Sequence, residues 1–265
     1  MSRDHDDEEG ALVAAVGPQG CGTPWLLLPG WQQSAAHWTP VARWLRGSGI
    51  TLLAADLAVA ATGCTAPQGT LARTEELVDR LLGAPAVAGA RIVVGHSAGA
   101  ALAVLVAADL PGIRGVIMVE PVGSHFGAAP PRFVEVPRPS GSQSGPRGLY
   151  PMADESTLRT IDAAARRLPR AEPAPGARMP TAVSPERAVR AGQALSAVRV
   201  PVLVVRGQAS ALLSAEDARA LAAMAPSGRC VTLSDTGHSP HIDRPRACAA
   251  QLAAFAADAI DPLST

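Results

Sequence analysis

Short, unbroken apolar runs alternate with segments of helical spacing along most of this chain. The runs lack the apolar–polar alternation of strands that leave one face in water, so each predicts a strand that is covered on both faces. Strands that alternate with helices build βαβ units, whose strands lie parallel. The sequence therefore predicts an α/β fold with a mostly parallel, twisted sheet flanked by helices. The predicted strands cover residues 12–16, 25–30, 50–56, 91–95, 115–120, 200–206 and 230–234.

The predicted helices lie between these strands or follow the last one. The clearest covers residues 98–110, because Ala and Leu favour helices and Pro111 followed by Gly112 ends one. Each helix provides cover for one face of the sheet. The other predicted helices cover residues 37–46, 71–82, 215–225 and 244–260.

One long stretch interrupts the alternation. Residues 123–198 are rich in Pro, Gly, Ser and Arg and contain only two short helical segments. We expect this stretch to be a cap or lid inserted between the strands 115–120 and 200–206 of a single core domain, which comprises residues 11–122 and 199–265. The two helical segments cover residues 156–167 and 185–194.

The composition narrows the classes of function. The 265 residues, 48% of them hydrophobic, support one sizeable core. The 23 basic residues, all Arg, balance 23 acidic ones, which does not favour a nucleic-acid surface. No run reaches the roughly 18–20 apolar residues of a membrane span, and the charged residues 1–10 predict a disordered acidic tail rather than a signal peptide. We expect a soluble, cytoplasmic protein with a small-molecule substrate; the oligomeric state stays open.

The four cysteines do not form a recognisable framework. They are far apart and include no C-x-x-C pair, which favours reduced thiols over disulfides or a zinc site. The glycines near residue 95 do not match a dinucleotide-binding loop. The sequence therefore predicts neither a metal nor a cofactor. The cysteines are Cys21, Cys64, Cys230 and Cys248.

A G-x-S-x-G motif joins a predicted strand to a predicted helix. Residues 95–99 read Gly-His-Ser-Ala-Gly, and the small residues around Ser97 allow the sharp turn that lifts a serine hydroxyl out of a sheet. A serine hydroxyl is a weak nucleophile and needs a positioned base. His238 follows the last predicted strand, where a loop histidine can reach across the strand ends. The alternative is a glycine-rich turn that merely begins a helix.

With these two residues the sequence resembles the α/β-hydrolase family over most of its length. In that family the nucleophile follows the fifth strand and the catalytic histidine the eighth, and the matching positions are Ser97 and His238. Residues 238–245, His-Ser-Pro-His-Ile-Asp-Arg-Pro, are similar to a family stretch whose first histidine is catalytic. The resemblance therefore gives His241 a structural role. A serine nucleophile argues against the branches that use aspartate, haloalkane dehalogenases and epoxide hydrolases.

The resemblance also implies an oxyanion hole made of backbone N–H groups. The family takes one N–H from the residue after the nucleophile, here Ala98, and one from the loop after the third strand. That loop, residues 29–33, reads Pro-Gly-Trp-Gln-Gln and resembles the family's His-Gly-x motif with Pro in place of His. We expect the second N–H at Trp31, whose side chain alternatively serves as a pocket wall.

The third member of the triad departs from the common pattern. The family's usual acid follows the seventh strand, but Ser210 stands at that place, and Glu216 and Asp217 read as the first turn of the next helix. Without an acid the histidine lacks the group that fixes its tautomer. The family has a second solution at the end of the sixth strand, where Glu120 stands. A carboxylate that ends an apolar strand is costly to bury without a partner; the alternative partner is a nearby Arg.

These residues predict a serine hydrolase of a small-molecule ester or thioester that works through an acyl-enzyme, with Ser97 as nucleophile, His238 as base and Glu120 as acid. The same triad supports lyase, acyltransferase or cyclase chemistry, and the fold does not choose among them. A catalytically inert ligand-binding scaffold is a further alternative, supported by the missing acid after strand 200–206. Neither the acyl group nor the leaving group can be read from the sequence.

Overall fold

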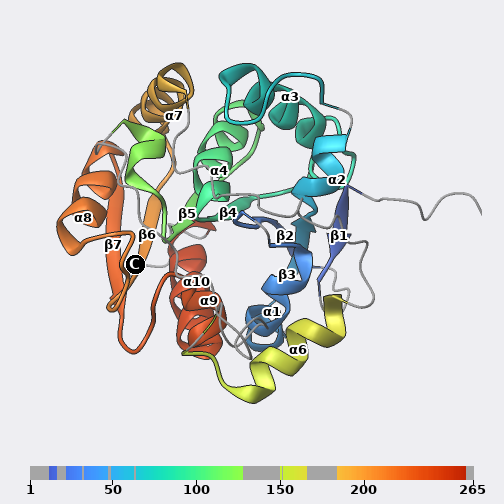
Figure 1. Cartoon of the computed structure of the whole chain (residues 1–265), viewed down its shortest axis with the longest axis vertical. Helices are drawn as coiled ribbons and strands as arrows, with labels where there is room; N and C mark the ends of the chain where they lie inside the picture. Colours follow the sequence, from blue (N-terminus) through green and yellow to red (C-terminus); the bar gives the residue numbers. More distant parts are fainter. Residues whose placement is uncertain are drawn as a thin grey trace, which may run out of the picture.

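The computed structural model shows a seven-stranded sheet between two layers of helices (Figure 1). The predicted tail, Cys21, Gln32 and much of the predicted insertion lie outside the described residues. The structure describes residues 12–16, 22–31, 33–46, 49–62, 64–127, 150, 152–165 and 184–260.

The sheet has the predicted, mostly parallel character. Its strand order is β1-β3-β2-β4-β5-β6-β7, and only the edge strand β1 runs antiparallel, along β3. Strands β4 and β5 are buried along their whole length, as their unbroken apolar sequence predicts. The strands are β1 (Val13–Ala15), β2 (Thr23–Leu28), β3 (Ile50–Ala55), β4 (Ile92–His96), β5 (Gly115–Val119), β6 (Val202–Gly207) and β7 (Gly228–Leu233).

The helices cover both faces of the sheet because successive strand residues point to opposite sides. In β2, Trp25 and Leu27 pack on one face, whereas Leu26 and Leu28 pack on the other. The Leu26 face is covered by α3 (Leu71–Leu82), α4 (Ala98–Asp109), α7 (Pro185–Ala197) and α8 (Ala215–Met224), and the Trp25 face by η1 (Ala35–Trp38), α1 (Thr39–Leu45) and α10 (Pro245–Ile260). Three further short helices are α2 (Leu57–Thr62), η2 (Gly123–Phe126) and α9 (Pro240–Asp243).

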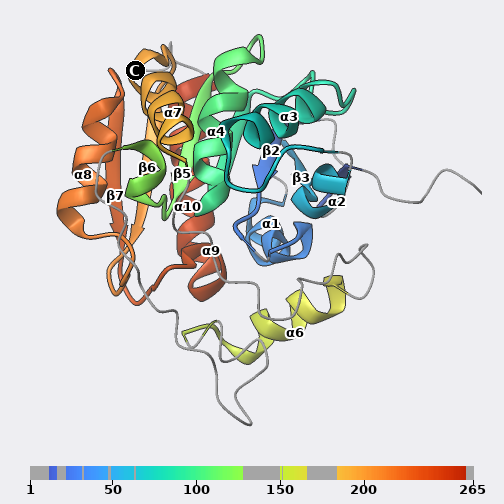
Figure 2. The ribbon, with the colours of Figure 1, turned by 45° about the horizontal axis from the view of Figure 1, so that its top comes forward.

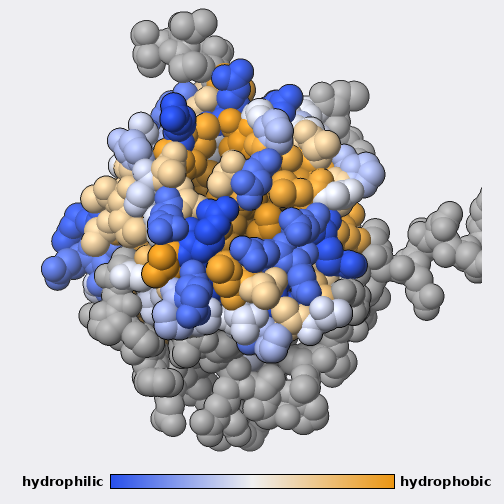
Figure 3. Space-filling model, turned by 90° about the horizontal axis from the view of Figure 1, so that it is seen from above, coloured by the Kyte–Doolittle hydropathy of each residue, from blue (hydrophilic) through white to orange (hydrophobic). Residues whose placement is uncertain are grey.

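Helix α4 is the centre of the Leu26 face. Its residues from Gly99 to Val106 are all buried. Figure 3 looks onto this face and shows apolar residues gathered between polar ones. A cavity of about 290 Å³ lies between α3, α4 and α7, and its lining includes Leu105 and Arg190. Arg190 Nη2 lies 3.8 Å from Asp109 Oδ2. This cavity lies among helices of one face and not at the strand ends.

The two described α-helices of the predicted insertion lie on opposite faces. Helix α7 packs against α4 and buries Ala191 and Leu195 in the large core. Helix α6 (Glu155–Ala165) lies beside α1 and η1 and has a small apolar cluster of its own that includes Ile242 of α9 (Figure 2). Residues 128–149 and 166–183 lie outside the described part. That residues 123–198 form one cap stays a prediction.

Candidate active site

The serine of the G-x-S-x-G motif sits on a strained turn between β4 and α4. Ser97 has φ 50° and ψ −116°, a region that non-glycine residues rarely adopt and that costs about 1–3 kcal/mol. The turn can close only because residue 99 is a glycine, since a Cβ atom there would lie 2.5 Å from the carbonyl oxygen of Leu28. At Gly95, a Cβ atom would collide with the backbone of Gly99. The small residues predicted around the serine are therefore required by the packing.

The predicted base reaches the serine from the other end of the chain. His238 lies in the loop between β7 and α9, and its Nε2 is 2.9 Å from Ser97 Oγ. The loop is held by Asp243, whose Oδ2 accepts a hydrogen bond of 2.8 Å from the Gly237 N–H. Burial raises the pKa of Asp243, although this hydrogen bond acts in the opposite direction. No pattern in the sequence had singled out Asp243.

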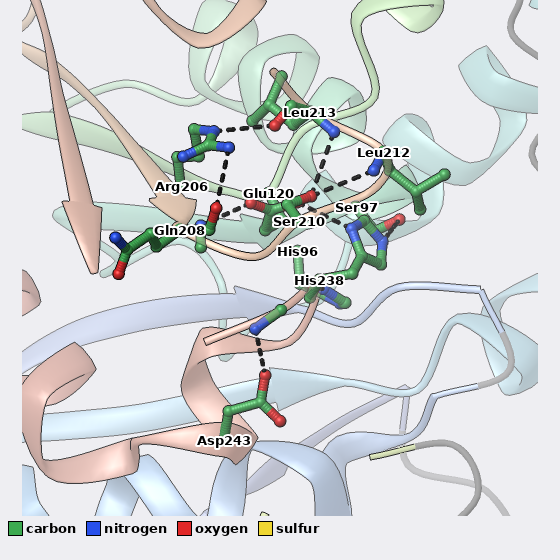
Figure 4. A network of polar contacts seen from close by, with 12 residues as sticks. His96, Ser97, Glu120, Arg206, Gln208, Ser210, Leu212, Leu213, His238 and Asp243 are labelled. Atoms are coloured by element: carbon green, nitrogen blue, oxygen red, sulfur yellow. Dashed lines mark hydrogen bonds and ion pairs between the residues drawn. The ribbon is translucent and has the colours of Figure 1, made fainter. Parts of the chain in front are cut away.

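The candidate acid is fully buried at the end of β5. Glu120 also has a positive φ, 49°, and its Oε2 lies 3.0 Å from His238 Nδ1 (Figure 4). Its Oε1 accepts a hydrogen bond of 2.6 Å from the Gly207 N–H, and Ser210 Oγ donates to Oε2 at 2.5 Å. Within the described residues, the titratable side chain that contacts the carboxylate of Glu120 is His238 and not an arginine.

The other carboxylates weighed for the acid's place do something else. Asp217 accepts a hydrogen bond of 2.7 Å from Ser214 Oγ at the beginning of α8, and Glu216 lies in the same first turn. Both residues therefore belong to the start of a helix, as the sequence indicates. The residue that stands at the family's usual acid position, Ser210, contacts Glu120 instead of His238.

The two predicted oxyanion donors lie on adjacent segments. Ala98 is the first residue of α4, so its N–H has no partner within the helix. The loop after β2 lies against the first turn of α4, since a Cβ atom at Gly99 would also lie 2.6 Å from the Pro29 carbonyl oxygen. Trp31 is partly buried in this loop. Gln33 fixes the loop, because its Oε1 accepts a hydrogen bond of 3.1 Å from the Gly30 N–H.

A buried histidine joins the three loops of the site. His96 Nε2 donates to the carbonyl oxygen of His238 at 2.7 Å, and its Nδ1 lies 2.7 Å from Gln33 Oε1. Burial lowers the pKa of His96 well below its usual range, and the neighbouring His238 adds to this effect. The second residue of the motif, His96, thus connects the turn at Ser97 to the loops of Gln33 and His238.

His241 lies behind this histidine and away from the serine. It is fully buried, with its ring 4.4 Å from that of His96 and 4.6 Å from that of Trp38, measured between centroids. Neither ring nitrogen has a hydrogen-bond partner in the described structure. Burial lowers the pKa of His241 well below its usual range. The position fits the structural role that the resemblance implies.

The segment that carries α6 contacts two of the site's loops. Tyr150 Oη accepts a hydrogen bond of 3.2 Å from Gln33 Nε2, and burial raises the pKa of Tyr150 to about 12. Arg244 donates to the Met152 carbonyl oxygen at 2.8 Å. Neither contact could be predicted from spacing. The first part of this segment is thereby joined to the loop after β2 and to the helix after His238.

Residues 25–251 match the sequence profile of the alpha/beta hydrolase family. The chain belongs to the alpha/beta hydrolase family. That match spans the serine turn, the candidate acid and the histidine loop. No curated protein matches the sequence.

Solved structures share the alpha/beta hydrolase fold with this chain. An esterase of M. tuberculosis is 21% identical, with 94% of this chain and 93% of that chain covered and a TM-score of 0.65. The thioesterase domain from the curacin biosynthetic pathway is 21% identical over 91% and 93% of the two chains, with a TM-score of 0.60. E-2-(acetamidomethylene)succinate hydrolase is 23% identical over 94% of each chain, with a TM-score of 0.61. At these identities the likeness shows the fold.

The described residues of this alpha/beta hydrolase contain neither a cluster of metal ligands nor a helix that could span a membrane. There, no group of three or more His, Cys, Asp or Glu side chains is arranged to hold a metal ion. The helices within those ranges are too short or too polar to cross a membrane. Cys64, Cys230 and Cys248 are free thiols.

Proposed function

We propose that this protein is a serine hydrolase that cleaves a small-molecule ester or thioester through an acyl-enzyme. The observation that carries the proposal is the continuous chain from Ser97 Oγ to His238 Nε2, 2.9 Å, and from His238 Nδ1 to Glu120 Oε2, 3.0 Å. These distances lie within the range of about 2.6–3.2 Å that proton transfer requires. The esterase and thioesterase folds among the similar structures are consistent with this substrate class.

The first half of the reaction acylates the serine. Ser97 Oγ attacks the substrate carbonyl carbon while His238 Nε2 takes its proton, and the Nδ1–H donates to Glu120, which stabilises the imidazolium. The N–H groups of Ala98 and Trp31 stabilise the oxyanion, and one such donor contributes about 10²–10³ in turnover. The tetrahedral intermediate then collapses, and His238 gives its proton to the departing alcohol or thiol.

The second half returns the enzyme to its starting state. A water molecule attacks the acyl carbon, His238 takes one of its protons, and the new tetrahedral intermediate expels Ser97 Oγ, which recovers the proton from His238. The products are a carboxylic acid and free enzyme. Residues 123–198 are proposed as the cap that covers the substrate, because Tyr150 contacts Gln33 in the loop after β2.

The experiment is labelling and turnover by the full chain. Fluorophosphonate should add one covalent adduct at Ser97, identified by peptide mass spectrometry, and p-nitrophenyl esters or acyl thioesters should be hydrolysed. Ser97→Ala should lose both the labelling and the hydrolysis, while its far-ultraviolet circular-dichroism spectrum stays that of the wild type. Ser227→Ala is the matched control, since Ser227 lies at the amino ends of the parallel strands, before β7, whereas Ser97 lies at their carboxyl ends, after β4.

Product analysis separates hydrolysis from the other chemistries of this fold. In ¹⁸O-labelled water a hydrolase releases a carboxylic acid that carries the label, whereas acyl transfer and cyclisation give products without it. Absence of both adduct and turnover in the wild-type protein would overturn the proposal in favour of an inert binding scaffold. An adduct at another serine would overturn the choice of nucleophile.

A further inference from the structure

Ser210 contacts the same carboxylate oxygen that contacts His238. Its Oγ lies 2.5 Å from Glu120 Oε2, and this oxygen lies 3.0 Å from His238 Nδ1 (Figure 4). We propose that Ser210 is a positioning residue, which holds the ionised carboxylate of Glu120 in the orientation that His238 requires. The inference rests on the proposed function, because it assigns Glu120 to the triad.

The direction of the Ser210 hydrogen bond follows from its other contacts. Its Oγ accepts hydrogen bonds from the N–H groups of Leu212, at 3.2 Å, and Leu213, at 3.1 Å. A serine hydroxyl has two lone pairs and one proton. Both lone pairs are occupied, so the proton is committed to Glu120. Ser210 therefore donates to the carboxylate of Glu120.

The donors to Glu120 come from two directions. The Gly207 N–H holds Oε1 at 2.6 Å, and Ser210 holds Oε2. The side chain is fully buried at the end of β5. A carboxylate with one donor on each oxygen cannot rotate about its last bond without losing one of them. The free lone pair of Oε2 then faces His238, which explains why a serine at this position matters for the base.

The turn that carries Ser210 has an independent support. Arg206 of β6 donates through Nε to the Leu213 carbonyl oxygen, at 2.9 Å, and through Nη2 to the Gln208 carbonyl oxygen, at 3.2 Å. These two contacts bracket Ser210 on both sides. The turn should therefore persist when the hydroxyl is removed, and an effect of that removal on catalysis reports the contact with Glu120.

The test compares Ser210→Ala, Ser210→Thr and the control Ser214→Ala in the full chain. Ser210→Ala should lower kcat about tenfold or more with KM unchanged, because Glu120 loses the hydrogen bond that orients it toward His238. Ser210→Thr keeps the hydroxyl and should stay within about threefold of wild type. Ser214, whose Oγ accepts from the Asp217 N–H at 3.0 Å, does not contact Glu120, and its removal should leave kcat unchanged.

A double-mutant cycle tests whether Ser210 acts through Glu120. In a Glu120→Gln background, Ser210→Ala should cause no further loss of kcat, because the interaction is already gone. A tenfold loss that persists in this background, or a wild-type kcat in Ser210→Ala, overturns the inference. Fluorophosphonate labelling of the wild-type protein keeps the two proposals apart: absent labelling defeats the proposed function, whereas normal labelling with a silent Ser210→Ala defeats only this inference.

Discussion

Replacing Glu120 with glutamine changes one polar group of a fully buried side chain, and the contacts of that side chain decide how the amide lies. The Gly207 N–H, 2.6 Å from Oε1, needs an acceptor. The Ser210 hydroxyl also donates to the carboxylate, but it can turn its proton away at the expense of its contact with the Leu212 or Leu213 N–H, whereas the backbone N–H of Gly207 cannot turn. The amide oxygen therefore takes the place of Oε1, and the NH₂ group takes the place of Oε2, facing Nδ1 of His238. An N–H donor at this place favours the imidazole tautomer whose proton sits on Nε2. That tautomer has no lone pair for the Ser97 proton.

The size of the loss follows from the alternative orientation. If the amide turns its oxygen to His238, two N–H donors face each other at Gly207, and a buried unsatisfied donor costs about 1–3 kcal/mol. At about 1.4 kcal/mol per factor of ten, the productive orientation is reduced about 5- to 150-fold. A neutral acceptor also stabilises the imidazolium less than a carboxylate does. A comparable change in serine proteases costs about 10⁴ in turnover, so we expect Glu120→Gln to lower kcat between about 10² and 10⁴.

The assay is steady-state hydrolysis of a p-nitrophenyl ester beside thermal unfolding. Unfolding should be unchanged or shifted slightly upward, because a buried charge costs free energy that the amide does not. Asp217→Asn is the control, since it removes a carboxylate at the start of α8 without a contact to His238, and it should be nearly silent. Near-normal turnover in Glu120→Gln with collapse in Asp217→Asn would refute the reasoning and return the acid to the loop after β6.

Three further outcomes follow from the site. His238→Ala should lower kcat by about 10²–10⁴ or more, the contribution of a general base, whereas His241→Phe should stay within about tenfold because steady-state rates depend on the residue that contacts Ser97. Burial lowers the pKa of His241. Below about pH 6.5, His241 therefore binds a proton in the unfolded chain but stays neutral in the folded one. The free energy of unfolding, measured by urea titration, should be highest above that pH and should decrease as the pH is lowered further. The decrease should be smaller in His241→Phe. Tyr150→Phe should lower it by about 1–3 kcal/mol because Gln33 Nε2 loses its acceptor; no change would contradict the burial of this contact.

The sequence predicts the elements whose signal is local and long. Helix α3 has the predicted bounds, Leu71–Leu82, and α4 ends one residue before the predicted end. Each predicted strand overlaps an observed one. The central strands β4 and β5 are covered on both faces as predicted, but β1 and β7 are not, because they lie at the two edges of the sheet and are partly exposed. The short helices α2, η2 and α9 were not predicted. They have six residues or fewer, too few for the apolar spacing of a helix to repeat.

The polar partners of the site were harder to predict than its central residues. Ser97, His238 and Glu120 stand at strand ends, where the order of elements brings them to one edge of the sheet. Gln33 meets Tyr150 across 117 residues, and nothing in either local sequence marks the pair. Ser210 was noted only as the residue that takes the acid's usual place. Its contact with Glu120 depends on how the ends of two adjacent strands, β5 and β6, are aligned.

Because of that alignment, residues 120 and 210 cannot both carry an ionised carboxylate. With Ser210 Oγ 2.5 Å from Glu120 Oε2, a second carboxylate there would meet the first, and the pair would share one proton at neutral pH. Ser210→Asp should therefore lower kcat by at least about tenfold, the effect of one lost charge-assisted hydrogen bond of about 1.5–3 kcal/mol.

Without the carboxylate of Glu120, the substitution Ser210→Asp should raise kcat instead of lowering it. Glu120→Gly clears the space and suits the backbone, since glycine adopts the φ of 49° freely. In the double variant Glu120→Gly, Ser210→Asp, the new carboxylate would accept from the N–H groups of Leu212 and Leu213 and reach toward His238 Nδ1, the place that Glu120 Oε2 leaves. We expect this double variant to turn over at least about ten times faster than Glu120→Gly alone, a gain equal to one restored charge-assisted hydrogen bond. Equal rates in the two variants would mean that the turn after β6 does not bring residue 210 close enough to the histidine.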